Sequence, residues 1–270
     1  MFRRILLLSL LAFLPLTATA ALDPGAPTVL ITGANRGIGL ELARQYAALG
    51  WNVIATTRRP PDDPGLAELR AIQEKHPRLV IERIDVTKTE MIRAVAEKYR
   101  DQPIDVLINN AAAVEDTFAA DMEEANTPFD RIDFDDARTD FDVNTLGPMR
   151  MAQAFLPHIE RSKQKKIANI TSLAGSFGQP LPGAIAMNYS ASKAALNKYS
   201  VLLSIALKER GILVGLFQPV FVASKKDMKN MQNASPVDVE VAKLIKHIEQ
   251  MSPETSGKIV NFQTGRIDPF

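Results

Sequence analysis

Short apolar runs alternate with longer segments of helical periodicity along most of the chain. The apolar runs are rich in Val, Ile and Leu, and they occupy residues 28–32, 51–57, 78–84, 104–110, 166–172, 212–219 and 257–262. Continuous apolar runs of this kind are typical of parallel strands that are buried on both faces of a sheet. The sequence therefore predicts about seven strands in one central, parallel sheet.

The segments between these runs carry apolar residues at helical spacing. We expect helices over Ile38–Leu49, Leu66–His76, Lys88–Tyr99, Phe141–Arg161, Ala191–Arg210 and Val237–Met251. Gly50 and Gly211 stand where two of these helices should end. The regular alternation of strand and helix predicts an α/β fold. We expect a Rossmann-type doubly wound sheet with helices on both faces, which is a three-layer sandwich.

The first twenty residues have a different pattern. Arg3 and Arg4 precede an apolar stretch over 5–16, and Ala18 and Ala20 form a small-residue cleavage pattern. This arrangement is typical of a signal peptide, and the apolar stretch is short against the roughly 20 residues that a membrane-spanning helix needs. We expect cleavage after residue 20, export to the periplasm, and a single domain over 21–270. The open alternatives are an uncleaved membrane anchor and the twin-arginine export route.

Composition narrows the choice of partners. The chain has 270 residues with 32 Lys+Arg against 31 Asp+Glu, so its charge gives no reason to expect a nucleic acid or an anionic membrane as partner. Its lack of cysteine excludes disulfides, thiolate chemistry and cysteine metal sites. The acidic segment over 115–142 contains carboxylates, but their spacing fits no metal-ligand template. We expect a solvated loop and a helix start there, and no metal.

Three glycines, Gly33, Gly37 and Gly39, lie between the first strand and the first helix. Glycines at such a bend let the backbone turn tightly and approach a pyrophosphate, while the helix N-terminus offers free N–H groups and a positive dipole end. No Lys-Ser/Thr pair follows, which excludes a phosphate-loop nucleotidase. The bend therefore predicts a dinucleotide site.

The end of the second strand indicates which dinucleotide is bound. An NAD site usually has an acidic residue there, whereas this chain has Arg58 and Arg59, and Arg36 lies in the glycine turn itself. Guanidinium groups suit the additional 2′-phosphate of NADP. The sequence thus predicts that NADP(H) is preferred over NAD(H), with surface arginines of no special role as the alternative.

Tyr189 and Lys193 are four residues apart and share one face of a predicted helix. A cation beside a phenol stabilises the phenolate, and we expect it to lower the tyrosine pKa from about 10 toward the working range. Tyr189 could then exchange a proton with a carbonyl oxygen. A bare pair of this kind arises often by chance, but its position after the fifth strand of a dinucleotide-type sheet favours a catalytic role.

Taken together, these motifs resemble those of the short-chain dehydrogenase/reductase family from about Thr28 to the end of the chain. The stretch over 252–270 is similar to the branch with C-factor-type and sniffer-type carbonyl reductases. The resemblance implies hydride transfer between NADP(H) and a carbonyl or alcohol. It also implies that Ser172 orients the carbonyl oxygen, Asn144 holds a water of a proton relay, Tyr189 protonates the substrate oxygen, and Lys193 lowers the tyrosine pKa and binds the nicotinamide ribose.

The glycine turn and the resemblance together imply a set of cofactor contacts. These are Gly33, Asn35, Arg36, Gly37, Ile38, Gly39, Arg58, Asp85, Val86, Asn110, Ala111, Pro219, Val222 and Ser224, with Tyr189 and Lys193. The chain departs from the family pattern at Ala112 and Val220, where glycine is usual. A β-branched residue restricts the backbone, and Val220 lies beside the expected nicotinamide position.

Two alternatives to a reductase follow from these observations. Val220 keeps open a non-catalytic NADP(H)-binding protein that acts in signalling or redox sensing. A nucleotide-sugar epimerase or dehydratase is a second alternative, opposed by the glycine spacing and by the lack of a large substrate domain. For the reductase we expect a small-molecule substrate in a pocket lined by residues 175–187 and 225–235. The apolar helical segments 149–159 and 194–207 predict a homo-oligomer, a dimer or tetramer, unless they are buried against their own sheet.

Overall fold

A computed structural model describes residues 22–114, 129–179, 183–184, 186–219, 222 and 235–270. The expected signal peptide, Val220 and Ser224 lie outside the described residues. Much of the acidic segment and most of the predicted substrate loop over 225–235 also lie outside them.

One sheet organises the described chain, and its strands run in the order β3-β2-β1-β4-β5-β6-β7-β8. The strands are β1 Thr28–Ile31, β2 Asn52–Thr57, β3 Leu79–Arg83, β4 Val106–Asn109, β5 Lys166–Ile170, β6 Leu213–Gln218, β7 Ile259–Asn261 and β8 Ile267–Asp268. The first seven pair in parallel, while β8 pairs antiparallel to β7. The predicted doubly wound α/β fold is confirmed, and β8 is too short to produce a periodic signal.

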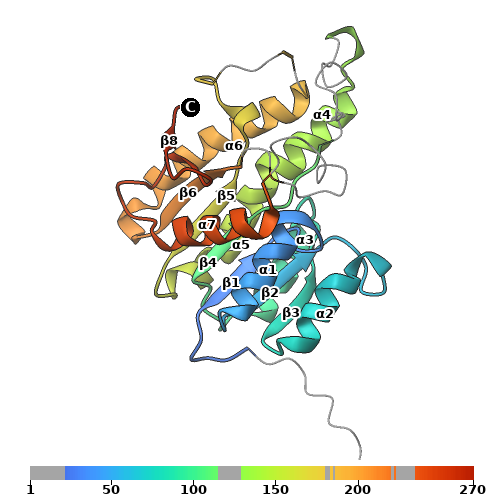
Figure 1. Ribbon diagram of the computed structural model, residues 1–270, viewed down its shortest axis with the longest axis vertical. Helices are drawn as coiled ribbons and strands as arrows, with labels where there is room; N and C mark the ends of the chain where they lie inside the picture. The colour runs from blue at the N-terminus through green and yellow to red at the C-terminus, as the bar shows by residue number, and fades with distance from the viewer. Residues whose placement is uncertain (1–21, 115–128, 180–182, 185, 220–221, 223–234) are drawn as a thin grey trace, which may run out of the picture.

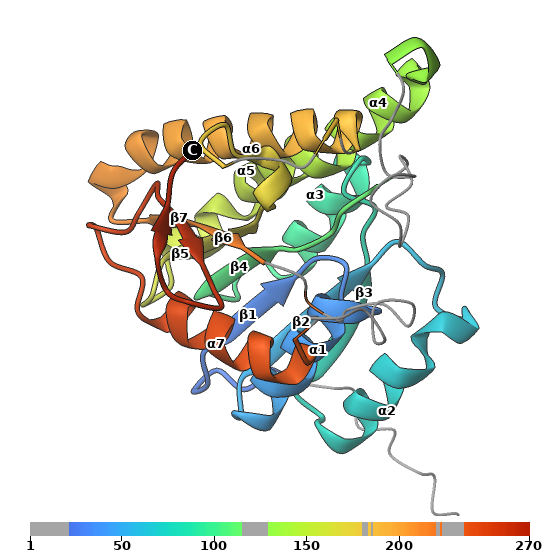
Figure 2. The same cartoon turned by 45° about the horizontal axis from the view of Figure 1, so that its top comes forward.

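Helices cover both faces of this sheet (Figures 1 and 2). They are α1 Gly37–Ala48, α2 Ala67–Lys75, α3 Thr89–Lys98, α4 Phe134–Phe141, α5 Gly147–Glu160, α6 Met187–Ala206 and α7 Val237–Glu249. Short 3₁₀ turns lie at Pro64–Leu66, Phe129–Arg131, Leu173–Gly175 and Lys208–Arg210. One core cluster joins α1, α2 and α7 to the sheet, and a second joins α3 and α5 to its other face.

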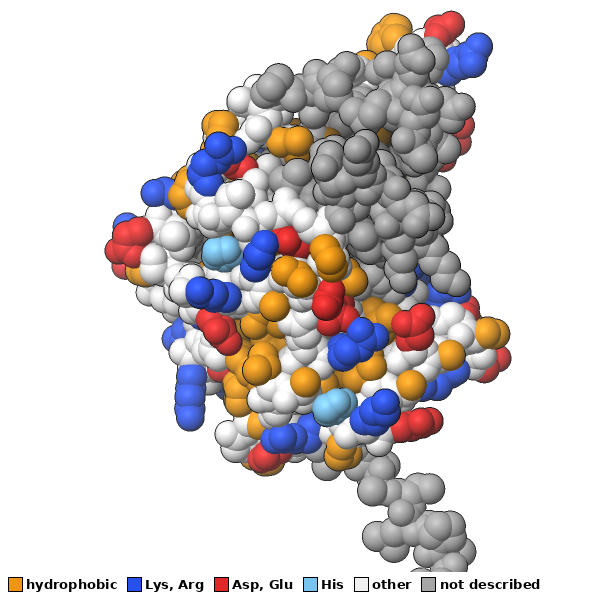
Figure 3. Space-filling model, viewed as in Figure 1, with side chains coloured by type: hydrophobic (Ala, Val, Ile, Leu, Met, Phe, Trp, Pro, Cys, Tyr) orange, Lys and Arg blue, Asp and Glu red, His pale blue; other side chains and the backbone are white. Residues whose placement is uncertain are grey.

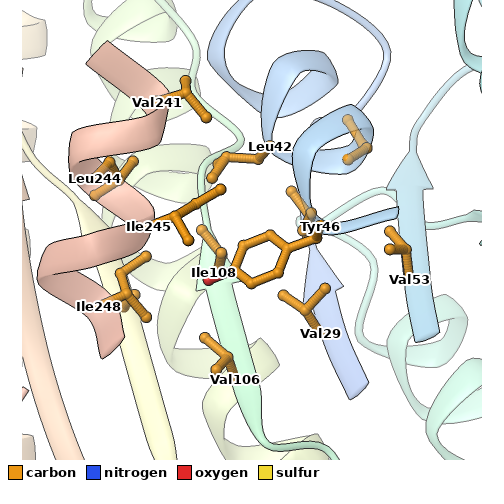
Figure 4. Close-up of a cluster of buried hydrophobic side chains, with 14 of the residues drawn as sticks. Val29, Leu42, Tyr46, Val53, Val106, Ile108, Val241, Leu244, Ile245 and Ile248 are labelled. Carbon is orange, nitrogen blue, oxygen red and sulfur yellow. The ribbon is translucent and has the colours of Figure 1, made fainter. Parts of the chain in front are cut away.

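The strands explain why both faces need a helical layer. Val29 and Ile31 of β1 belong to the cluster under α1 and α7, whereas Leu30 between them belongs to the cluster on the opposite face. All three side chains are fully buried. Figure 4 shows the first cluster, in which Tyr46 of α1 lies between the sheet and Ile245 of α7. Burial on both faces is the physical reason for the continuous apolar runs in the sequence.

The helix predicted over 141–161 begins earlier than expected. α4 starts at Phe134, where Asp133 caps it by accepting hydrogen bonds from the backbone N–H groups of Asp135 and Asp136 at 2.7 and 3.3 Å. A π-helical turn, Asp142–Leu146, joins α4 directly to α5. The acidic residues of this stretch gave no apolar periodicity, so the first two turns of the helix were missed.

The start of α6 was also predicted wrongly. The helix begins at Met187 rather than at Ala191, and it ends at Ala206, before a 3₁₀ turn that closes at Gly211 with φ +69°. Asn and Ser residues at its start have modest helix propensity, which tertiary packing overrides here. The earlier start places Tyr189 and Lys193 on one regular helix.

On the face shown in Figure 3, acidic and basic side chains are interspersed, as expected from the balanced composition. Within the described part of the chain, no helix is both long enough and apolar enough to cross a bilayer.

Candidate active site

The glycine turn lies where the strand order reverses, between the carboxyl ends of β1 and β4. Gly33 and Gly37 have φ values of +68° and +57°, in the left-handed region that favours glycine. A Cβ atom on Gly39 would lie 2.3 Å from the Gly33 carbonyl oxygen and 2.5 Å from the Asn110 side-chain nitrogen. α1 therefore packs directly on the turn, and no larger residue fits at Gly39.

Thr32 and Asn110 hold the two sides of this crevice together. The Thr32 hydroxyl accepts hydrogen bonds from the backbone N–H groups of Asn110 and Ala111, both at 3.0 Å. The Asn110 side chain donates in return to the carbonyl oxygens of Thr32 at 2.9 Å and Gly33 at 3.2 Å. Arg36 at the start of α1 provides no side-chain cap. The first N–H groups of the helix are thus left for a ligand.

A cleft of about 840 Å³ opens beside the turn, a size that suits a small-molecule or cofactor site. Its lining includes most of the predicted cofactor residues, namely Gly33, Asn35, Arg36, Gly37, Ile38, Arg58, Asp85, Val86, Asn110 and Ala111. Gly39 is buried behind the lining. Ala112, one of the two departures from the family pattern, lines the same cleft. The structure thus brings together residues that are far apart in the sequence.

The three arginines near the cleft have different surroundings. Arg59 donates to both carboxylate oxygens of Asp63, each at 2.9 Å, so its guanidinium is already engaged. Arg36 and Arg58 are exposed and form no ion pair with the described residues. Arg36 and Arg58 therefore have no carboxylate partner among the described residues, whereas Arg59, which also lines the cleft, is paired with Asp63 through one of its nitrogens.

Asp85 provides the negative charge at the same cleft. One of its carboxylate oxygens accepts hydrogen bonds from the backbone N–H and the hydroxyl of Thr87, at 2.9 and 2.8 Å. Partial burial acts to raise the Asp85 pKa, but these bonds and the charges of Lys88 and Arg58 outweigh it. The pKa is lowered overall, so Asp85 is an ionised acceptor at neutral pH.

Tyr189 and Lys193 lie together on α6, against the carboxyl end of β5. The Lys193 ammonium donates to the Ile170 carbonyl oxygen at 2.9 Å and lies 5.7 Å from the centre of the Tyr189 ring. Ser172, which follows β5, hydrogen-bonds through its side chain to Tyr189. The predicted serine, tyrosine and lysine thus form one cluster.

Asn144 joins this cluster to the cofactor side of the sheet. It lies in the π-helical turn, where its amide pairs with the backbone of Ala113 through two hydrogen bonds of 2.9 and 2.8 Å. Its side-chain nitrogen also donates to the Ser192 hydroxyl at 3.0 Å. Turns of π-helix are frequent at functional sites. Asn144 is therefore placed with the other three catalytic candidates, and its role in a water relay stays a prediction.

The expected lowering of the tyrosine pKa is wrong. Burial raises the pKa of Tyr189 to about 12, although its hydrogen bond with Ser172 opposes the rise. Burial likewise lowers the pKa of Lys193 to about 8. Loss of water destabilises the buried phenolate more than the Ser172 hydrogen bond stabilises it. Without cofactor, Tyr189 is therefore a protonated phenol at neutral pH, which suits a proton donor.

Two features of the site were missed in the sequence. Asp140 is fully buried near Tyr189 and Lys193, yet it stands among acidic residues that we expected to be solvated. The stretch after β8 packs on the loop that follows Ser172: the Gly178 N–H donates to the Phe270 carbonyl at 2.6 Å. No local pattern marks either feature, because each contact joins distant segments.

Of the residues predicted beside the nicotinamide, Pro219 and Val222 belong to the described chain. Pro219 follows β6 and is partly buried. Val222 is 4% exposed, belongs to the hydrophobic core and forms a parallel bridge with Ser235. Its side chain therefore faces the interior, and only its backbone could contact a cofactor.

Comparison with known proteins agrees with this geometry. The family model described as short chain dehydrogenase matches residues 27–235. The chain belongs to the short-chain dehydrogenase family and is an oxidoreductase of that family.

Three known proteins illustrate the similarity. The C-signal protein of Myxococcus xanthus is 31% identical over 172 residues, which cover 64% of this chain and 96% of that protein. The NADPH-bound carbonyl reductase from chicken fatty liver superposes with a TM-score of 0.79 at 32% identity, covering 91% and 99% of the two chains. Carbonyl reductase Sniffer of D. melanogaster has the same fold, with a TM-score of 0.78 at 22% identity over 91% and 100% of the chains.

Proposed function

We propose that this protein is an NADPH-dependent reductase of small-molecule carbonyl compounds. The observation that carries the proposal is the cluster of Ser172, Tyr189 and Lys193 at the same sheet edge as the glycine-turn cleft. Further support comes from the NADPH-bound carbonyl reductase that shares 32% identity with this chain. The cluster also distinguishes this proposal from a protein that only binds the cofactor, because such a protein would have no use for a buried proton donor.

Each residue of the proposed site has a separate role in the reduction. NADPH, when bound in the cleft, supplies the hydride that reaches the carbonyl carbon. Ser172 and Tyr189 can both donate hydrogen bonds to the carbonyl oxygen, which fixes its position. The Tyr189 hydroxyl then transfers its proton to that oxygen, and the nearby Lys193 ammonium stabilises the phenolate that remains. Asn144 holds the end of β4 against α6, so that the two halves of the site keep their spacing.

Tyr189→Phe is the most direct test of this mechanism. Removal of the hydroxyl should lower kcat/KM for carbonyl reduction by about 10²–10⁴-fold, because general acid catalysis is lost. NADPH binding, followed by fluorescence, should change little. Tyr199→Phe is the matched control, since Tyr199 is 46% exposed on the same helix. Full activity in Tyr189→Phe would exclude the mechanism, and NADPH binding by the native protein without turnover of a broad carbonyl panel would favour the sensor alternative.

We also propose that NADPH is preferred over NADH. Arg36 and Arg58 line the cleft without an ion pair among the described residues, and two guanidinium groups suit a phosphate dianion. β2 ends at Thr57 and is followed by Arg58 and Arg59, so no carboxylate stands there to accept hydrogen bonds from a ribose.

Arg58→Ala tests this preference. Loss of a charge-assisted hydrogen bond of about 1.5–3 kcal/mol should weaken NADPH binding about 10- to 100-fold and leave NADH binding nearly unchanged. Arg59→Ala is the matched comparison, because Arg59 lines the same cleft but is paired with Asp63, so its loss should weaken NADPH binding less. Titration calorimetry with NADPH and with NADH gives the ratio of native to variant affinity for each cofactor. Equal losses of affinity for NADPH and NADH in Arg58→Ala would show that Arg58 does not recognise the 2′-phosphate.

We propose that two or more copies associate through α6. Tyr199, Leu202 and Ile205 are 46%, 50% and 66% exposed and recur every three residues along this helix. Most apolar residues of the other predicted segment, on α5, are buried against the chain's own sheet, as with Phe155 and Ile159. Light scattering should show a dimer or tetramer that Leu202→Glu converts to smaller species. A native monomer at micromolar concentration would contradict this proposal.

Export through the N-terminal segment is a further proposal, which rests on the sequence alone. Arg3 and Arg4 before an apolar stretch should direct the chain across the membrane, with cleavage after Ala20. We expect mass spectrometry of the protein from a cell fraction outside the cytoplasm to give a mature N-terminus at Ala21. An intact Met1 on protein in the membrane fraction would instead indicate the anchor.

A further inference from the structure

Asp140 is the one fully buried carboxylate on α4, and the proposed mechanism does not use it. Its side chain has no exposed area, whereas Asp135 on the same helix is 90% exposed and paired with Arg138 at the surface. A buried carboxylate is costly unless opposite charge or hydrogen bonds offset the loss of water. The environment of Asp140 should therefore contain the group that makes its burial tolerable.

α6, against which α4 packs, brings a group of opposite charge into the same interior. Asp140 interacts electrostatically with both Tyr189 and Lys193, and it lies four residues before Asn144, whose side chain also reaches α6. Lys193 is 3% exposed, and its ammonium donates to the neutral carbonyl of Ile170. A carbonyl does not balance a full positive charge, so a carboxylate in the same interior complements the ammonium.

Other described elements packed against α6 bring no competing charge to this pair. The 3₁₀ turn Leu173–Gly175 and strand β6 contain no ionisable residue. In the π-helical turn, Asp142 is paired with Arg150 at 2.6 Å. The charged residues of the 3₁₀ turn Lys208–Arg210 lie at the far end of α6. Within the described chain, Asp140 is thus the acidic side chain that acts on both Tyr189 and Lys193.

We propose that Asp140 is a positioning residue whose buried negative charge keeps the proton on the Tyr189–Lys193 pair and so favours carbonyl reduction over alcohol oxidation. This inference rests on the proposed function. Reduction requires a proton on Tyr189, whereas oxidation requires that proton to be absent. The negative charge acts to raise the pKa of both members, although burial leaves the pKa of Lys193 lowered overall. Whichever group loses its proton first, the alkaline limit of reduction therefore moves to higher pH.

Asp140→Asn tests the proposal because it removes the charge and nearly preserves the shape. In profiles of kcat/KM against pH, the alkaline fall of carbonyl reduction should move about one pH unit or more toward lower pH. The rise of alcohol oxidation should move by the same amount, since the two directions share one proton. Reduction measured above the native midpoint should fall about tenfold, while reduction at low pH should change little.

Two controls separate charge from structure. Asp135→Asn removes an acid from the surface of the same helix and should leave both profiles in place. Asp140→Glu retains the charge and should return the midpoints toward their native values. Asp140→Ser provides a second neutral variant, and thermal unfolding identifies which variants are folded.

The outcomes distinguish this inference from the proposed function. A folded neutral variant with unshifted profiles overturns the role of Asp140, and so does Asp140→Glu if it shifts them as far as Asp140→Asn does. If the native protein binds NADPH but turns over no carbonyl, the proposed function fails first. In that case ¹³C NMR of labelled tyrosine, compared between native and Asp140→Asn proteins, still reports whether the charge raises the Tyr189 pKa.

Discussion

Thr32 joins the two halves of the sheet, and the geometry of the site depends on this contact. The chain leaves β1 for β2 and β3 on one side, then returns to β4 and continues on the other side. Where the two directions part, the described residues leave a cleft of about 840 Å³. The Thr32 hydroxyl and the Asn110 side chain close the base of this crevice with four hydrogen bonds. They hold the glycine turn against the segment that follows β4.

The candidate functional residues from both halves of the sheet lie at this same edge. Every strand from β1 to β7 runs parallel, so the residues that follow β1, β4, β5 and β6 converge at one side of the sheet. The continuous helix from α4 through its π-helical turn into α5 carries Asn144 between Ala113 and Ser192. This arrangement links the dinucleotide cleft to the Tyr189–Lys193 pair without using a flexible segment.

Burial has the largest effect on the pKa values of Tyr189 and Lys193. In water a nearby ammonium would make the phenol more acidic, yet in the interior the loss of hydration has the larger effect, and the pKa of Tyr189 rises to about 12. The same loss favours the neutral form of Lys193. Asp140 opposes that tendency for lysine and strengthens the rise for tyrosine. The electrostatic balance of the site is therefore set by which groups are buried together.

The sequence by itself determined the fold class, the glycine turn and the four catalytic candidates. These features are local, because strand and helix periods and the Tyr189–Lys193 spacing are encoded within single elements. The tertiary structure alone decided that Arg59 is paired with Asp63, whereas Arg58 has no ion-pair partner among the described residues. It also decided that Asp140 is buried, although its acidic neighbours in the sequence were expected in solvent. It also reversed the expected direction of the Tyr189 pKa. Charge and hydration depend on neighbours from distant segments, which no local pattern specifies.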